Sequence, residues 1–301
     1  MSAGPVVDDR ASRASEAGRG PWSDAWRRLR RNRVAVVGGV LLLTVVVACV
    51  FLPALLGLDP RQQATANRDQ PPTASHWLGT DSLGRDYAAR VLVGGQFSLL
   101  VGLVGTLVCV VIGTLYGAVS GFYGGRVDDV MMRFVDFMYG IPYMFLVILI
   151  ILTMEDTERQ NPVAIFAALG LLQWLTMARI VRGQVLTLRE QEYVLAARVM
   201  GAGDLRLIFR HILPNCVGPI VVYGTLQVGA VILLESFLSY LGLGLELSWG
   251  ILVAEAVSIV NPIESRWWLL LFPSVLLAAT LLSLNFLGDG LRDAFDPRTR
   301  R

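Results

Sequence analysis

The chain is organised as six long apolar runs separated by shorter polar segments. The runs carry no charged side chain, and they are Val34–Leu56, Phe97–Phe122, Phe137–Met154, Pro162–Ala178, Ile212–Leu234 and Trp267–Gly288. A helix needs roughly 20 apolar residues to cross the hydrocarbon core of a bilayer. The pattern therefore predicts an all-α, polytopic membrane protein with six transmembrane helices.

Two of the connecting segments differ from simple loops. Gly57–Gln96 is long and polar, and we expect it to form an external loop. Glu235–Arg266 is apolar but interrupted by glycines, which predicts a re-entrant or interfacial segment, since irregular backbone at membrane depth must be covered by protein or water. Its two acids, Glu235 and Glu255, are expected near the interface, where water would solvate them; an ion pathway is the alternative.

Small residues recur along the second run. Gly113, Gly117 and Gly121 are spaced four residues apart and therefore share one helix face. Such a face lets a neighbouring helix approach closely in the membrane. We interpret it as a packing face, with a sliding or gating face as the alternative. Pro142, near the start of the third run, predicts a helix start or a kink.

The distribution of arginine predicts the orientation. Five arginines lie between Arg27 and Arg33, and residues 179–211 hold six arginines against three acids. Because cytoplasmic segments are enriched in basic residues, both termini are expected to be cytoplasmic. We divide the chain into a disordered tail (1–25), a first helix with its external loop (26–96), a core domain (97–298) and a short tail (299–301).

Composition narrows the chemistry. Hydrophobic residues make up 54% of the chain and charged residues 17%, against about 25% charged in a typical soluble domain. All 26 basic residues are arginine, so the lysine of a Walker A loop and Schiff-base catalysis are both excluded. The two histidines lie far apart, and the three cysteines show no metal-ligand spacing. We expect no catalytic, cofactor-binding or metal-binding residue, and an enzyme within the membrane is disfavoured.

The external loop contains one concentrated polar motif, HWLGTDSLGRD at residues 76–86. Glycines beside Thr, Asp and Arg are typical of a tight hydrogen-bonded turn. The candidate residues are His76, Gly79, Thr80, Asp81, Gly84, Arg85 and Asp86. A lone histidine here is read as a turn residue rather than a metal ligand.

The segment EYVLAARVMGAGDLRLIFRHILPN, from Glu192 to Asn215, is polar for so apolar a chain. It predicts a helix, a turn at Gly201–Gly203 and a second short helix ending at Pro214. Physical reasoning leaves two interpretations open: an amphipathic hairpin on the inner leaflet, or a docking element for a cytoplasmic partner.

Several motifs resemble one family. One segment is similar to the EAA loop of binding-protein-dependent ABC importer permeases. It contains Glu192, Ala196, Ala197 and Gly201, followed by IFRHILPN. Six further stretches resemble the dipeptide/oligopeptide/nickel permeases, specifically their C-type subunit. They are WRRLRRNRVAVVG, HWLGTDSLGRDYAARVLVGGQFSL, GFYGGRVDDVMMRFVDF, ARIVRGQVLTLREQEYV, ESFLSYLGLGLELSWG and NFLGDGLRDAFDP. The resemblance runs from about Trp26 to Arg298.

The resemblance implies a mechanism and partners. It implies a type I ABC importer permease that forms a heterodimer with a second homologous permease and works by alternating access. Two cytoplasmic ATPase subunits, or one fused ATPase, would bind ATP and Mg, and an extracytoplasmic binding protein would deliver the substrate. Residues 179–211 would form the cytoplasmic coupling loop, and its ATPase-docking residues would be Glu192, Ala196, Ala197, Gly201, Ala202, Gly203, Asp204, Leu205 and Arg206.

Substrate and surroundings follow from the same resemblance. Di- or oligopeptides are the expected cargo, with nickel or another small ligand as the alternative. The chain would lie in the bacterial cytoplasmic membrane, surrounded by the lipid bilayer, with no nucleic acid partner. A stand-alone channel or secondary transporter is the more distant alternative, since it would require ionisable groups at mid-membrane or paired broken helices.

Overall fold

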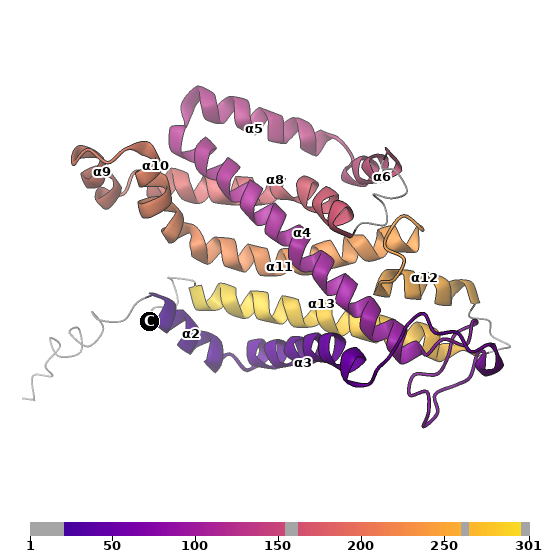
Figure 1. Cartoon of the computed structure of the whole chain (residues 1–301). Coiled ribbons are helices and arrows are strands. Elements are labelled where there is room, and N and C mark those ends of the chain that lie inside the picture. The colour runs from indigo at the N-terminus through magenta and orange to yellow at the C-terminus, as the bar shows by residue number, and fades with distance from the viewer. Residues whose placement is uncertain (1–20, 154–161, 260–264, 296–301) are drawn as a thin grey trace, which may run out of the picture.

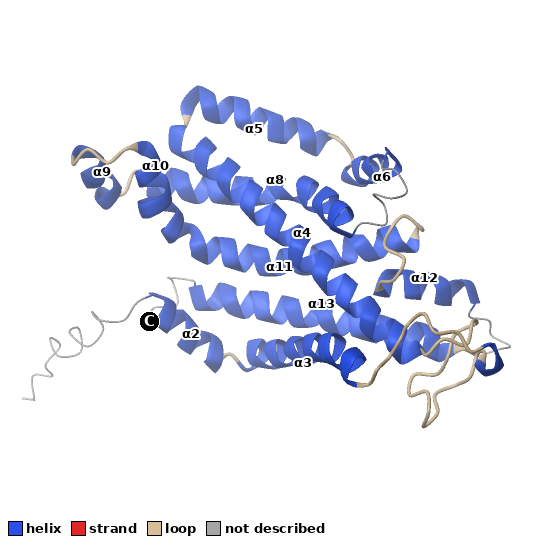
Figure 2. Ribbon diagram, viewed as in Figure 1, coloured by secondary structure: helices blue, strands red, loops and turns tan. Residues whose placement is uncertain are grey.

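The computed structural model describes residues 21–153, 162–259 and 265–295. Within these ranges the chain is almost entirely helical (Figure 2), and its only β-type pairing is an isolated antiparallel bridge between Thr80 and Asp86. The all-α prediction is therefore confirmed. The residues of the predicted tails at 1–20 and 299–301 lie outside the described ranges.

The described residues form the following helices, in chain order. They are α2 (Pro21–Arg31), α3 (Arg33–Leu55), α4 (Tyr87–Tyr123), α5 (Gly125–Gly140), α6 (Tyr143–Thr153), α8 (Pro162–Leu188), α9 (Glu192–Val199), α10 (Asp204–Arg206), α11 (Leu213–Tyr240), α12 (Trp249–Ile259) and α13 (Trp267–Phe295). A 3₁₀ turn spans Thr65–Asn67, and a π-helical turn, Leu207–Ile212, joins α10 to α11.

Four helical stretches are long and apolar enough to cross a membrane: Arg33–Leu55, Tyr87–Tyr123, Asp204–Tyr240 and Trp267–Phe295. The pair α5 and α6 adds a fifth if it is taken as one broken span. The remaining predicted span, Pro162–Ala178, falls in α8, which is not among these, so the count of six stays a prediction.

The third predicted span is not one straight helix. Its axis bends by 82° between α5 and α6, at Ile141 and Pro142. Proline lacks the N–H that a continuing helix needs, and it pushes the preceding residue towards extended backbone. Ile141 accordingly has φ −90° and ψ 127°. Both expectations for Pro142 are met, because the helix axis bends there and the Pro142 carbonyl accepts bonds from the Phe145 and Leu146 N–H groups at the start of α6.

Two other predicted boundaries were wrong. The predicted tail 1–25 ends too late, because α2 already begins at Pro21; Leu29 of α2 lies against Gly290 of α13, whose added Cβ would sit 3.3 Å from it. The second helix of the Glu192–Asn215 segment does not end at Pro214. It continues through the π-helical turn into α11, and Pro214 lies just after the point where that turn ends.

The glycine face of α4 packs against α8. A Cβ added at Gly113 would lie 2.7 Å from the Trp174 carbonyl oxygen, and one at Gly117 would lie 2.3 Å from the Ala178 carbonyl oxygen. Gly121 meets Val185 in the same way. The packing interpretation of this face is therefore confirmed, because close approach of the two backbones leaves no space for a side chain.

The connecting segments and the ends of the helices lie at two opposite ends of the bundle (Figure 1). The start of α2, the end of α13 and the α9–α10 turn lie at one end, whereas residues 57–86 and α12 lie at the other. The two predicted candidate motifs therefore occupy opposite ends of the molecule.

Candidate functional site

The α9–α10 turn is built by a specific helix stop. The backbone N–H of Gly201 donates to the Arg198 carbonyl, and that of Ala202 donates to the Ala197 carbonyl, each at 3.0 Å. This pair of bonds is the Schellman arrangement, which needs a residue in the left-handed region. Gly201 supplies it with φ +89°. The predicted role of Gly201 at the bend is thus explained by its backbone.

The turn is anchored to the bundle on its inner side. Val194 is fully buried and belongs to the same apolar cluster as Phe122, Leu207 and Ile208. Ala197 packs partly against this cluster, whereas Ala196 is exposed. The small pair 196–197 therefore contributes one residue to packing and one to the surface.

Arginines tie the same region to α4 and α5. The Arg189 guanidinium donates to the Gly121 carbonyl at 3.0 Å, which satisfies part of the C-terminus of α4. Arg182 of α8 donates two bonds to the carboxylate of Asp128 in α5, and Ser120 of α4 donates a third. Asp128 is buried, so the three helices are fixed to one another at this end by a charge-assisted clamp. We refer to Asp128, Arg182 and Ser120 as the Asp128 clamp.

The outer side of the turn carries no neighbour from the described chain. Val199 and Met200 are each 88% exposed, and Leu205 is 71% exposed. Of the predicted docking residues, Ala197 and Ala202 are half-buried and the other seven are exposed: Glu192, Ala196, Gly201, Gly203, Asp204, Leu205 and Arg206. An exposed apolar patch that is surrounded by charged residues has the composition typical of a protein-binding surface.

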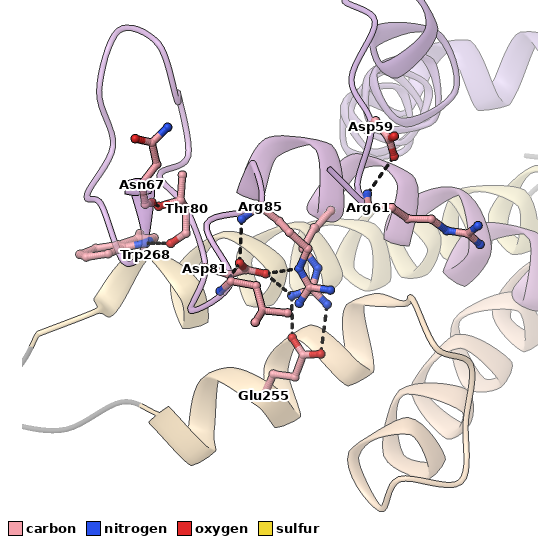
Figure 3. A network of polar contacts seen from close by, with 10 residues as sticks. Asp59, Arg61, Asn67, Thr80, Asp81, Arg85, Glu255 and Trp268 are labelled. Atoms are coloured by element: carbon pink, nitrogen blue, oxygen red, sulfur yellow. Dashed lines mark hydrogen bonds and ion pairs between the residues drawn. The ribbon is translucent and has the colours of Figure 1, made fainter. Parts of the chain in front are cut away.

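At the opposite end, the external motif folds on itself around Asp81. Its carboxylate accepts bonds from the backbone N–H groups of Leu83 and Arg85, both at 2.9 Å, and from the Arg85 guanidinium at 2.7 Å. Thr80 is fully buried, and its hydroxyl donates to the Asn67 carbonyl. Figure 3 shows Asp81 at the centre of these contacts.

Two glycines of the motif are required by the backbone. Gly79 has φ +79° and Gly84 has φ +71°, both in the left-handed region. A Cβ at Gly84 would lie 2.0 Å from the Ala64 carbonyl oxygen. His76 contacts Asp86 through Nδ1 at 2.9 Å, while Asp86 also caps the start of α4 through the Ala89 N–H. All seven predicted residues of the motif thus come together.

The motif is latched to the membrane helices by residues that sequence reasoning missed. Arg90 of α4 is 3% exposed and donates to Asp81 at 3.0 Å and to both carboxylate oxygens of Glu255 in α12, at 2.7 and 3.0 Å. The Trp268 indole N–H of α13 donates to the Thr80 carbonyl. We refer to Asp81, Arg90 and Glu255 as the external latch, of which Figure 3 labels Asp81 and Glu255.

The latch also explains where α4 begins. The predicted span begins at Phe97, although the charge-free stretch already starts at Val91. The helix starts at Tyr87, since Arg90 is neutralised by two carboxylates and Asp86 supplies the N-cap.

The prediction for the two acids of the 235–266 segment needs correction. Glu255 is paired with Arg90, and its side chain is 39% exposed. Glu235 is fully buried rather than solvated; its Oε1 accepts from Ser239, and the loop that follows α11 covers it through Ser248. No charge pattern in the sequence distinguished these two environments.

Residues 113–301 match the model of a binding-protein-dependent transport system inner membrane component, and residues 20–72 match the N-terminal transmembrane domain of oligopeptide transport permease C. The chain belongs to this family of ABC importer permeases.

Individual relatives agree over nearly the whole permease. The dipeptide transport system permease protein DppC of Bacillus subtilis is 43% identical over 92% of this chain and 86% of its own. The oligopeptide transport system permease protein OppC of Escherichia coli K12 is 45% identical, covering 94% and 93%. The glutathione transport system permease protein GsiD of Pectobacterium atrosepticum is 36% identical, covering 98% and 95%.

One solved structure shares the permease fold. A chain of the MetNI methionine ABC transporter, in inward-facing conformations, superposes with a TM-score of 0.51 at 17% sequence identity, covering 69% of this permease and 96% of that chain. The helical arrangement described above is thus that of a type I ABC importer permease.

Proposed function

We propose that this permease is the C-type transmembrane subunit of an ATP-driven importer of di- or oligopeptides. The names of the relatives support a peptide cargo. A second homologous permease pairs with it, an extracytoplasmic binding protein delivers the cargo at the 57–86 end, and separate ATPase subunits bind ATP and Mg. The lysine-free sequence supports this division, because a P-loop requires a lysine. In this arrangement both termini are cytoplasmic.

The observation that carries the proposal is the α9–α10 turn. Its outer side presents Val199, Met200 and Leu205, while its inner side is anchored by Val194 and Arg189. A rigid, apolar-tipped projection can seat in a groove of a partner, as amphipathic helices do. The anchoring contacts would then pass a movement of the partner directly to the ends of α4 and α8.

The test is co-purification of the permease with candidate ATPase subunits, in the membrane-extracted complex. Glu192→Arg reverses a charge on the first turn of α9 and should reduce recovery of the ATPase at least tenfold. Glu246→Arg is the matched control, because Glu246 is an exposed acid in the loop at the opposite end. Equal ATPase recovery with both variants would refute docking at this turn.

Cargo is tested separately in the reconstituted complex. ATP hydrolysis should be stimulated by the binding protein loaded with a di- or oligopeptide. Stimulation by nickel-loaded binding protein, with none by peptide, would replace the peptide proposal with the nickel alternative.

A further inference from the structure

Two cavities lie along one face of α5. The first, of about 230 Å³, lies at the bend between α5 and α6 and faces α8; its polar lining consists of Tyr139, Tyr143, Gln173 and Thr176. The second, of about 470 Å³, lies further towards the α9–α10 end and is lined by Asp129, Arg133 and Asp136 among others. Both cavities lie along the bent pair α5 and α6, which counts as a fifth span if it is taken as one broken helix.

The first cavity is bordered by hydrogen-bonding groups that carry no charge. The Gln227 amide of α11 donates to the Gln173 side-chain oxygen at 2.6 Å, and Tyr143 also bonds to the Gln173 side chain. Tyr139 and Thr176 share a hydrogen bond across the cavity wall. Polar side chains are costly among apolar helices, and where they surround a cavity they mark a path for a polar ligand.

An ion pair separates the two cavities. Arg179 of α8 contacts Asp136 of α5 at 2.6 Å, and its guanidinium lies 4.1 Å from the centre of the Tyr139 ring. The side chains of Arg179 and Asp136 are 44% and 66% exposed, so both remain accessible. The second cavity is lined by the carboxylates of Asp129 and Asp136 and the guanidinium of Arg133, and Arg179 adds a second guanidinium through its ion pair with Asp136.

We propose that this face of α5, α6 and α8 is the portion of the translocation path contributed by this subunit, and that its ligand is a zwitterionic peptide. The inference rests on the proposed function and names the residues that receive the cargo. The amide and hydroxyl groups of Gln173, Thr176 and Tyr143 match the donors and acceptors of peptide bonds. Asp136 pairs with an ammonium group and Arg179 with a carboxylate as the peptide passes.

The size of the first cavity fits a passage rather than a storage site. At about 230 Å³ it is smaller than the roughly 300–1,000 Å³ of a pocket for a whole small molecule. It therefore holds one part of an extended chain at a time, while the rest of the peptide lies in the space completed by the second permease.

Removing one charge of the ion pair at a time tests the proposal in the complete reconstituted transporter. Uptake is measured with three tripeptides, Ala-Ala-Ala, Ala-Lys-Ala and Ala-Glu-Ala, and their ratios are compared with wild type. Arg179→Gln leaves the carboxylates in excess and should favour the lysine peptide over the glutamate peptide about fivefold, as expected for one unit charge at a half-exposed site. Asp136→Asn should shift the ratio about fivefold in the opposite direction.

A merely structural ion pair gives a different result, because both variants would then lower uptake of all three peptides by the same factor. That outcome overturns the inference. Should Arg179→Gln fail to assemble, Asp136→Asn alone must still favour the glutamate peptide, or the inference is wrong.

A hydroxyl deletion tests the first cavity. Thr176→Val should lower the number of peptides moved per ATP hydrolysed several-fold. Thr225→Val is the matched control, because its hydroxyl bonds only to the Val221 carbonyl of its own helix. Equal peptide-to-ATP ratios for the two variants would contradict the path. If the wild-type complex takes up no peptide at all, the proposed function fails rather than this placement of the path.

Discussion

Arg90 of the external latch offers the sharpest test of how the outer loop is held. Its side chain is 3% exposed and donates three bonds to two carboxylates at 2.7–3.0 Å. Arg90→Met keeps much of the side-chain length but leaves Asp81 and Glu255 without this partner. Deleting one member of a buried ion pair costs about 3–5 kcal/mol. Because the side chain of Glu255 is 39% exposed, the lower end, about 3 kcal/mol, applies.

The cost should appear as local opening of the loop rather than as global unfolding. A loss of about 3 kcal/mol corresponds to roughly a hundredfold increase in the open population. Hydrogen exchange measured by mass spectrometry on the full-length permease would report it, since the N–H groups of Gly84 and Tyr87 are bonded within the motif. We expect these amides to exchange about a hundredfold faster, and the α9 amides to be unchanged.

The matched control is Arg68→Met, because Arg68 is an exposed arginine of the same loop. It should leave exchange within the motif unaltered. If Arg90→Met also left the motif amides as protected as in wild type, the latch would contribute nothing to holding the loop, and our reasoning would be refuted.

Two further predictions concern glycines with matched controls. Gly84→Ala should destabilise the external loop by at least about 2 kcal/mol, because the added Cβ would meet the Ala64 carbonyl. The loss should be seen as faster proteolysis within residues 57–86. The control is Gly57→Ala, which has the same left-handed backbone but open space around its Cβ and should cost only about 1 kcal/mol. Gly117→Ala should lower the thermal unfolding temperature in detergent, because overpacking costs about 1–3 kcal/mol. Gly183→Ala in α8, with nothing near its Cβ, should leave that temperature unchanged or raise it. Equal effects within either pair would contradict the packing described.

The features that could be predicted from the sequence are those determined by residues close together in the chain. Apolar runs predicted the membrane helices, the four-residue glycine spacing predicted the α4 packing face, and Gly201 predicted the helix stop. Each of these depends on residues within a few turns of one another, so one sequence contains the whole pattern.

Features set by distant residues could not be predicted in the same way. Arg90 and Glu255 are far apart in the chain, and only the fold brings them together. Glu235 looked like an interfacial acid because its burial depends on the loop that carries Ser248. The Asp128 clamp was overlooked for the same reason, since Asp128 and Arg182 each resemble ordinary charges beside a span.

The measurement that bears most directly on the central claim is peptide uptake into proteoliposomes that contain this permease, its partner permease and the ATPases. The account predicts that peptide accumulates only when ATP and the peptide-loaded binding protein are both present. Accumulation without ATP, driven instead by an imposed ion gradient, would contradict the claim and support a stand-alone transporter.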